Sequence, residues 1–238
     1  MEIKFIDTKP ESLRFIEPPK PASLFVPEWY KSMPVLGGRH SKIGIGDGNP
    51  PAPNTTVKAC SPFLDSLTAG YVWSAPADIE IRRENDQFSF RWRTVGEMIS
   101  EHSAAQHPGL PPVEGGADFV MKWAFHFVIE TPPGYSTFFT HPLNRHDLPF
   151  RTFSGVVDTD TYPLAVQFPF QVITKDIEDR IIIDEGTPLC QFFPIKREPW
   201  KSSTSVETEN DVAKRNFDFK KKIVRAYKSR YWHKKSFT

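Results

Sequence analysis

Two stretches of the sequence decide the fold. They are Ser154-Gly155-Val156-Val157-Asp158-Thr159-Asp160-Thr161-Tyr162 and Ile181-Ile182-Ile183-Asp184-Glu185-Gly186-Thr187-Pro188-Leu189-Cys190-Gln191-Phe192-Phe193. Both place β-branched and aromatic residues between Asp, Gly and Pro, a pattern that predicts strands ending in acidic or glycine turns. The first predicts a buried strand that ends at Asp158, where a carboxylate needs a partner or a solvated pocket. Asp158 is therefore either a functional residue or a turn residue that bonds to its own backbone.

Apolar and polar residues alternate in the segments that precede these stretches. In residues 87–93, Phe88, Phe90 and Trp92 share one face of a predicted strand, and residues 78–83 alternate in the same way. The polar residues between the two segments predict a hairpin. Further strands are predicted at residues 57–60, 68–73, 119–129 and 135–140. This alternation is typical of antiparallel sheets with one solvated face, so we expect a mainly β protein.

The C-terminal part of the chain has a different character. Apolar residues recur every fourth position at Phe219, Ile223, Tyr227 and Tyr231, which predicts an amphipathic α-helix. Residues 211–238 contain ten Lys or Arg and two Asp. Such a basic face is usually solvated or docks on an acidic surface of its own chain, and binding of nucleic acid through this tail is the alternative.

Three segments follow from these patterns. We expect an N-terminal arm and linker at residues 1–56, a β domain at residues 57–197, and a linker with the basic helix at residues 198–238.

Composition limits the class of protein. The chain has 238 residues, with 23 prolines, 20 phenylalanines and a formal net charge of +1. The many prolines favour short strands over long helices, and the low net charge indicates no nucleic-acid partner for the chain as a whole. Cys60 and Cys190 are too few for a disulfide framework or a four-cysteine zinc site. Neither a signal peptide nor a membrane span is predicted, so we expect a soluble, cytoplasmic protein with no membrane partner.

Several motifs resemble the superfamily of dUTP pyrophosphatases and dCTP deaminases. Gly155-Val156-Val157-Asp158 is similar to its Gly-Val-Ile-Asp hairpin, and Gly186-x-x-x-x-Gln191 to the strand that follows. Upstream, Thr68-Ala69-Gly70-Tyr71 resembles the first motif and Pro132-Pro133-Gly134-Tyr135 the turn before the second. The resemblance covers roughly residues 60 to 197. It implies an antiparallel β-clip or jelly-roll-like barrel, a nucleotide ligand and a homo-oligomer.

The same resemblance implies roles for single residues. Asp158 would be the catalytic base that orients an attacking water, and Tyr162 would stack on the substrate. The sequence departs from the superfamily at Val72, where the first motif carries Asp, and at residues 141–150, which replace its Ser-Gly phosphate motif. The segments His-Pro-Leu-Asn-Arg-x-Asp-Leu-Pro-Phe and Ser-Gly-Val-Val-Asp-Thr-Asp more closely resemble an uncharacterised family of phage and bacterial proteins, from which no activity carries over.

Polar residues are concentrated between His141 and Asp160, beside strands rich in phenylalanine. This combination predicts a small-molecule pocket with substrate-binding residues Asn144, Arg145, His146, Asp147, Asp160 and Tyr162. Arg145 would clamp an anion in a bidentate manner. The alternative is an internal bridge from Arg145 to Asp147 that stiffens the loop.

The sequence is consistent with three hypotheses about the function. Hydrolysis of a nucleotide or a related phosphorylated metabolite is the first hypothesis. The second is a metal-dependent oxidase or tailoring enzyme on a jelly-roll barrel, in which His102, His107 and His141 would bind the metal, although five residues separate the first two histidines. The third is a non-enzymatic binding or assembly protein. The cofactor is not determined by the sequence, and a divalent metal ion is the candidate.

Overall fold

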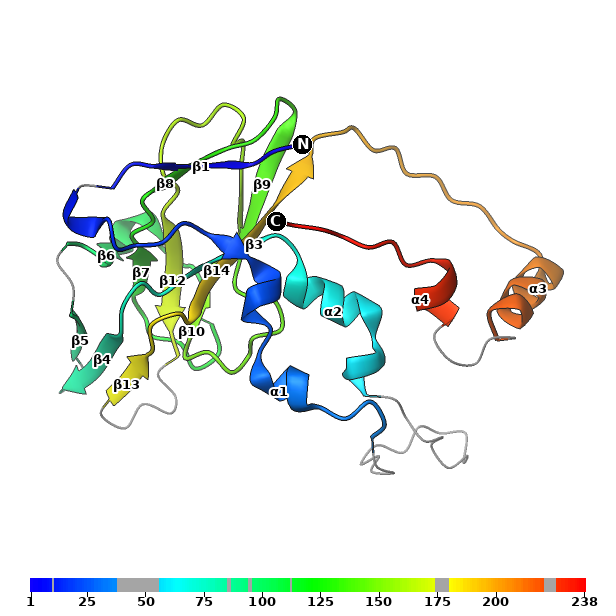
Figure 1. Cartoon of the computed structure of the whole chain (residues 1–238), viewed down its shortest axis with the longest axis horizontal. Coiled ribbons are helices and arrows are strands. Elements are labelled where there is room, and N and C mark those ends of the chain that lie inside the picture. The colour runs from blue at the N-terminus through cyan, green and yellow to red at the C-terminus, as the bar shows by residue number, and fades with distance from the viewer. Residues whose placement is uncertain are drawn as a thin grey trace. The chain divides into compact units, whose positions relative to one another are not determined.

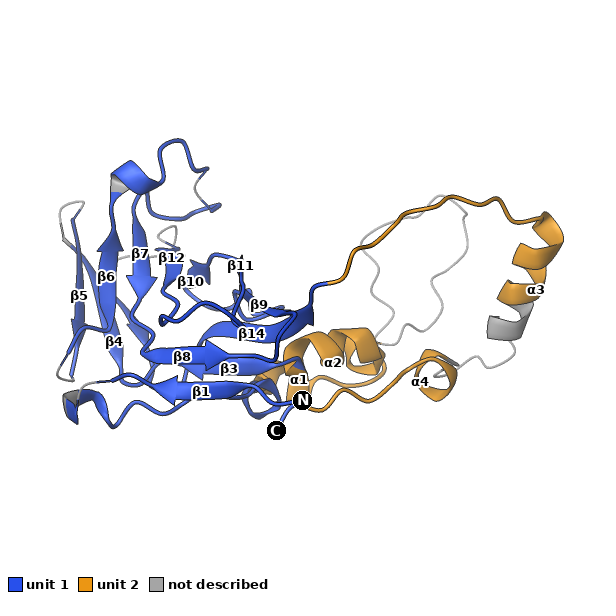
Figure 2. Cartoon of the chain, turned by 90° about the horizontal axis from the view of Figure 1, so that it is seen from above, with its two compact units in different colours: residues 1–25, 69–197, 237–238 blue, residues 26–68, 198–236 orange. Residues whose placement is uncertain are grey.

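The computed structural model describes residues 1–9, 11–37, 56–84, 87–93, 96–111, 113–173, 180–220 and 226–238. The chain forms two compact units, coloured separately in Figure 2. The first, the β unit, comprises Met1–Phe25, Ala69–Arg197 and Phe237–Thr238. The second, the helical unit, comprises Val26–Thr68 and Glu198–Ser236.

The β unit contains four open sheets in which the paired strands are antiparallel. Their orders are β1-β8, β10-β12-β7-β6, β11-β9-β14-β3-β2 and β13-β4-β5 (Figure 1). The strands are β1 (Lys4–Asp7), β2 (Lys20–Pro21), β3 (Tyr71–Ser74), β4 (Ile79–Glu84), β5 (Gln87–Trp92), β6 (Ile99–His102), β7 (Val120–Trp123), β8 (Phe127–Glu130), β9 (Tyr135–Thr140), β10 (Phe150–Thr152), β11 (Gly155–Val157), β12 (Phe168–Val172), β13 (Arg180–Ile183) and β14 (Pro188–Lys196). Short 3₁₀ turns are η1 (Glu11–Leu13), η2 (Ala22–Phe25) and η4 (Ala104–Gln106).

The helical unit is made of short helices. They are α1 (Glu28–Ser32), η3 (Val57–Ala59), α2 (Ser61–Thr68), α3 (Glu209–Lys220) and α4 (Ala226–Arg230). The expected fold, mainly antiparallel β with a C-terminal helix, is confirmed. Of the four apolar residues that predicted this helix, Ile223 lies outside the described residues. No described helix is long and apolar enough to cross a bilayer.

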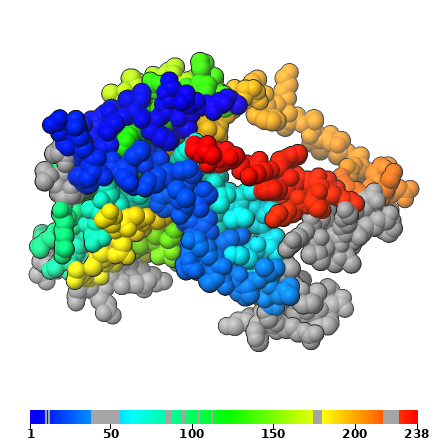
Figure 3. All heavy atoms as spheres, in the orientation of Figure 1, coloured from blue at the N-terminus to red at the C-terminus, as the bar shows by residue number. Residues whose placement is uncertain are grey.

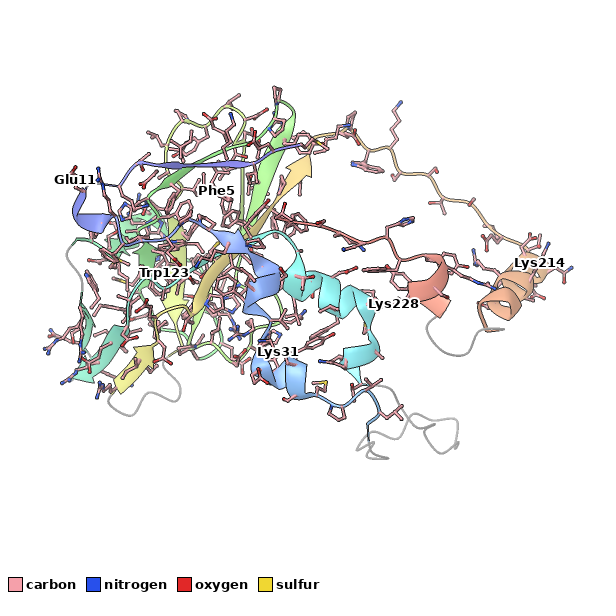
Figure 4. The ribbon with its side chains drawn as sticks, viewed as in Figure 1. Phe5, Glu11, Lys31, Trp123, Lys214 and Lys228 are labelled. Carbon is pink, nitrogen blue, oxygen red and sulfur yellow. The ribbon has the colours of Figure 1, made fainter. Side chains whose placement is uncertain are left out.

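One aromatic core joins the four sheets of the β unit. Trp123 lies at its centre, with its ring stacked on Phe170 at a centroid distance of 3.5 Å and edge-on to Phe150 at 5.2 Å. Figure 4 shows Trp123 within the strands and Phe5 on β1. Fully burying a phenylalanine side chain contributes roughly 1.5–3 kcal/mol, so many of the phenylalanines in the sequence stabilise this core.

The predicted β4–β5 hairpin is present with the expected faces. The register runs from Ile79 opposite Trp92 to Glu84 opposite Gln87. Phe88 packs against the core from this hairpin, as the alternation indicated. The tip of the hairpin lies outside the described residues.

Two predicted strands are corrected by the structure. Residues 57–60 were expected to form a strand, but Thr56 Oγ1 accepts a hydrogen bond from the backbone N–H of Lys58 and starts a 3₁₀ turn. Residues 119–129 were expected to form one strand, but the chain changes sheet at residues 124–126, because β7 pairs with β6 and β12 while β8 pairs with β1. Residues 1–56 were expected to be an arm and linker; within them β1 pairs with β8, and Met1–Phe25 group with the β unit.

The strand that ends at Asp158 is also not buried as expected. β11 pairs only with β9 and lies at the edge of its five-stranded sheet (Figure 2). Val156, at its centre, is 57% exposed. Asp158 therefore follows a solvated edge strand and not a buried one.

Two segments far apart in sequence build the helical unit. Within it, Tyr30 stacks on Phe63 with a centroid distance of 5.8 Å. Trp232 donates its indole N–H to the carboxylate of Asp65 at 2.8 and 3.0 Å, and Lys235 binds the same carboxylate at 2.6 Å. These bonds tie the segment after β14 to the segment before β3.

Candidate functional site

The predicted pocket between His141 and Asp160 is divided by strand β9. One set of polar residues lies where β9 begins, and the other follows its last residue. β9 has six residues, so its two ends are separated by five rises of about 3.4 Å, or about 17 Å in total. We call the sets the Asp158 end (Ser136, Asp158, Asp160 and Arg197) and the His141 end (His141, Arg145, Asp147 and Arg151). The expectation of one pocket is corrected, because the strand holds the two sets apart.

At the Asp158 end, one arginine joins two carboxylates. Asp158 Oδ1 accepts a hydrogen bond from Ser136 Oγ at 2.6 Å and lies 3.2 Å from Arg197 Nη1. The same Nη1 donates to Asp160 Oδ1 at 2.9 Å, and Nη2 pairs with Asp160 Oδ2. The backbone N–H of Gly134 also donates to Asp160 Oδ2, at 2.8 Å. The Asp158 carboxylate thus bonds across to β9 and does not cap its own turn.

The two carboxylates have different environments. The side chain of Asp160 is 5% exposed, and the hydrogen bonds from Arg197 and from the Gly134 backbone lower its pKa from the ordinary value. The same pairing raises the pKa of Arg197. The side chain of Asp158 is 63% exposed. Asp160 therefore anchors Arg197, whereas Asp158 presents a carboxylate to solvent.

Buried hydroxyls fix the turn that carries both aspartates. Thr159 Oγ1 lies 2.8 Å from Thr131 Oγ1 and 2.7 Å from Thr137 Oγ1. The Asp158 carbonyl accepts from the backbone N–H of Thr161 at 3.0 Å and of Tyr162 at 2.9 Å. A turn bonded at both backbone and side chain presents Asp158 in one orientation.

A cleft of about 520 Å³ opens beside this turn. One wall comes from β1 and β8, which lie side by side in Figure 1, and the other from residues 159–163. The lining is rich in hydroxyl groups, from Thr8, Thr131, Thr159, Thr161 and Tyr162. Tyr162 is 40% exposed, so part of its ring is free for an incoming molecule.

At the His141 end, Arg145 is committed to a carboxylate of its own loop. Its Nε and Nη2 donate to the Asp147 carboxylate at 2.9–3.1 Å, a bidentate pair. Burial is the largest single influence and would raise the pKa of Asp147. The hydrogen bonds from Arg145, the hydrogen bond to its own backbone and the charge of Arg145 together lower that pKa. The internal bridge, which was the alternative to an anion clamp, is therefore the arrangement observed. The preceding Asn144 has φ of +59°, a left-handed turn conformation.

The ring of His141 has protein partners at both nitrogens. The backbone N–H of Thr152 donates to Nδ1 at 3.3 Å, and Nε2 lies 2.9 Å from the Arg145 carbonyl and 3.0 Å from Arg151 Nη1. Burial, aided by the charge of Arg151, lowers the pKa of His141 to about 4. His141 is neutral at pH 7 and positions the loop. His146 is exposed, with Nδ1 3.5 Å from Arg151 Nη2.

The motifs that contain Ala69-Gly70 and Gln191 have a structural role. The side chain of Gln191 is buried, accepts from the backbone N–H of Leu143 at 2.8 Å and donates to the carbonyl of Ala69 at 2.7 Å. Gly70 has φ of +68°, and a Cβ there would lie 2.1 Å from the Phe192 carbonyl oxygen. The Ala-Gly and Gly-x-x-x-x-Gln motifs thus pack β3 closely against β14.

The three histidines proposed as metal ligands are not brought together. His102 and His107 are neighbours, with ring centroids 5.9 Å apart, and burial lowers the pKa of His102. His141 lies in the hydrogen-bonded loop after β9. Among the described residues, no group of three or more His, Cys, Asp or Glu side chains is arranged to hold a metal ion.

Sequence reasoning missed Ser136 and Arg197. Both bond to Asp158, yet neither belongs to a motif that we singled out. The position of Arg197 directly after β14, the strand that carries Gln191, could have identified it. β14 runs antiparallel to β9 and therefore returns to the turn at Gly134. No pattern in the sequence marked the buried hydroxyls of Thr131, Thr137 and Thr159.

Comparison with known proteins finds only weak similarity to solved structures. No family model matches the chain, and no curated protein matches it. The native dUTPase of EIAV aligns with 58% of this chain and 87% of its own, at 15% identity and a TM-score of 0.31. A mutant dUTPase from phage phi11 of S. aureus aligns with 59% of this chain and 85% of its own, also at 15% identity and a TM-score of 0.31. Likenesses this low carry no argument about activity.

Proposed function

We propose that the Asp158 end is the active site of a hydrolase that acts on a nucleotide or a related phosphorylated metabolite. The observation that supports this is the contrast between two neighbouring carboxylates. Asp160 is buried, paired with Arg197 and part of the cleft lining, whereas Asp158 is exposed and oriented by Ser136 and Arg197 on the turn that carries the cleft wall. Two carboxylates in different environments are typical of a site where one is structural and the other reacts.

In the proposed reaction Asp158 is the general base. Its Oδ1 lies 3.2 Å from Arg197 Nη1 and accepts a hydrogen bond from Ser136 Oγ. Within the described part of the chain, Oδ2 accepts no protein hydrogen bond, so it is available to a water molecule. As that water attacks phosphorus, its proton moves to Oδ2, a phosphorus–oxygen bond forms, and the bond to the leaving oxygen breaks.

The cleft would bind the non-reacting part of the substrate. Threonine hydroxyls both donate and accept hydrogen bonds, which suits the hydroxyls of a sugar and the polar edge of a base. The exposed part of the Tyr162 ring offers a stacking surface. Asp158 and Tyr162 thus keep the roles proposed from the sequence, whereas Asp160 holds Arg197 and is not assigned to the substrate. Asn144, Arg145, His146 and Asp147 lie at the other end of β9.

The test is hydrolysis of a panel of nucleoside mono-, di- and triphosphates and sugar phosphates, with and without Mg²⁺, followed by ³¹P NMR. Asp158→Asn should lower the rate about 100-fold or more, while the exposed control Asp184→Asn leaves it unchanged. The proposal fails if no compound is hydrolysed. Stabilisation by a compound that is not hydrolysed would instead favour the non-enzymatic binding protein.

We also expect a cytoplasmic homo-oligomer, which follows from the sequence resemblance alone. Light scattering on the purified chain measures its mass, and a monomer over the micromolar range would refute the expected oligomer.

A further inference from the structure

A second polar cavity lies on the three-stranded sheet β13-β4-β5, away from β9. The strand register places Arg180 opposite Arg82, and Glu80 opposite Ile182 and Arg91. Residues directly opposite each other in an antiparallel pair lie on the same face, and Glu80 and Arg82 are two positions apart on β4, so these side chains form two adjacent rows on one face of the sheet. Figure 3 shows the yellow atoms of β13 beside the turquoise atoms of β4 at the surface.

The cavity has a volume of about 280 Å³ and an excess of positive charge. Its charged lining residues are Asp78, Glu80, Arg91, Arg93 and Arg180, and its apolar walls are Trp92 and Ile182. Three guanidinium groups thus face two carboxylates. A fourth, Arg82, lies beside the cavity and pairs with Glu80.

Both carboxylates are already committed to the protein. Glu80 Oε1 lies 3.0 Å from Arg82 Nη2 and 2.5 Å from Arg180 Nε, and the hydrogen bond from Arg82, with the charge of Arg180, lowers the pKa of Glu80. Asp78 Oδ1 accepts from the backbone N–H of Glu185 at 2.8 Å. Neither carboxylate needs a cation from outside the chain.

Two of the arginines are not committed. The side chains of Arg91 and Arg93 are exposed, and neither makes a hydrogen bond or ion pair within the residues that the structure describes. They are two positions apart on β5, so their Cα atoms are about 7 Å apart and their side chains point to one face. Guanidinium groups match phosphate oxygens in a bidentate geometry, and two at this spacing suit two linked phosphates.

We propose that this cavity, the arginine pocket, binds a phosphate-bearing anion through Arg91 and Arg93. Ile182 and Trp92 supply an apolar wall for the group attached to the phosphate. The pocket lies on a different sheet from Asp158, so it is a second ligand site and does not depend on the proposed hydrolysis. Two neighbouring phosphates occur in a free diphosphate, where they are joined directly, and along a nucleic-acid backbone, where a sugar joins them. The experiment below separates these sources.

The test is calorimetric titration of the full chain with inorganic pyrophosphate at low ionic strength. Saturable binding is expected, and the double variant Arg91→Ala/Arg93→Ala should weaken it about tenfold or more, because each charge-assisted bond contributes more than about 1.4 kcal/mol. The exposed control Arg14→Ala, which removes one arginine outside the pocket, should change the affinity by less than about twofold. Circular dichroism confirms that each variant is folded.

Two further measurements sharpen the test. Asp158→Asn should leave pyrophosphate binding at the arginine pocket unchanged, so this proposal and the proposed hydrolysis fail separately. A single-stranded oligonucleotide that binds about tenfold tighter than pyrophosphate, and loses that binding in the double variant, identifies a nucleic-acid backbone as the source of the phosphates. Absence of saturable binding, or equal affinity in the double variant and the native chain, overturns the proposal.

Discussion

The two ends of strand β9 have similar composition and different chemistry. At the His141 end, Arg145 is paired with Asp147 and both ring nitrogens of His141 have protein partners. At the Asp158 end, Asp160 is equally paired, but the carboxylate of Asp158 is exposed to solvent. A high density of polar residues therefore does not identify a binding site. What distinguishes the Asp158 end is a group whose hydrogen-bonding capacity is not exhausted by the protein.

The largest change in stability is expected for substitution of Gln191, whose side chain holds the loop at the His141 end. Gln191→Leu keeps a similar volume but leaves the N–H of Leu143 and the carbonyl of Ala69 buried without this partner. We expect a loss of roughly 4 kcal/mol in the free energy of unfolding, measured with urea. Gln167→Leu removes one bond at an exposed side chain and is the matched control. Equal losses in the two variants would contradict a structural role for Gln191.

The next effect is a pH dependence that originates at His141. Its folded pKa of about 4 lies below the unfolded value of about 6.5. As the pH falls below about 6.5, the unfolded chain binds a proton that the folded chain excludes, so stability present above that pH is lost progressively down to about pH 4. The loss attributable to this ring is roughly 3 kcal/mol. Urea unfolding at several pH values should show a flatter profile for His141→Gln, and an unchanged profile would refute the assignment.

A smaller effect is expected at the Arg145 pair. Arg145→Ala should cost about 1 kcal/mol, because Asp147 is half-exposed and solvent screens the pair. Thermal melting measures the loss of stability in this variant, and melting in the presence of a compound that stabilises the native chain measures the ligand response. If Arg145 clamps a ligand instead, the melting temperature stays unchanged and the ligand response disappears.

The smallest effect on stability is expected at Asp158. Asp158→Asn should change the free energy of unfolding by less than about 0.5 kcal/mol, since the side chain is exposed. Asp160→Asn, in contrast, should destabilise the protein measurably, because Asp160 anchors Arg197 and accepts from Gly134. Differential scanning calorimetry of the two variants compares them directly. Greater destabilisation by Asp158→Asn would reverse the roles assigned to the two carboxylates.

The sequence predicted the fold better than the site. Period-two alternation placed β4, β5 and β9 correctly, because side chains on a strand must alternate between core and solvent. The same signal did not show that residues 119–129 change sheet, since both halves remain apolar. Asp158 was identified through its motif. Its partner Arg197 and the hydroxyl of Thr159 were not, because these contacts arise when distant strands pair and leave no local pattern.

The helical unit has a consequence for the order of folding. Its two segments are separated in sequence by Ala69–Arg197 of the β unit, and the bond from Trp232 to Asp65 spans 167 residues. Contacts of such long range require closure of a very large loop and form slowly unless the intervening chain is already compact. We therefore expect the β unit to fold before the helical unit, and pulse-labelled hydrogen exchange should show amides of β9 and β14 protected before those of α2.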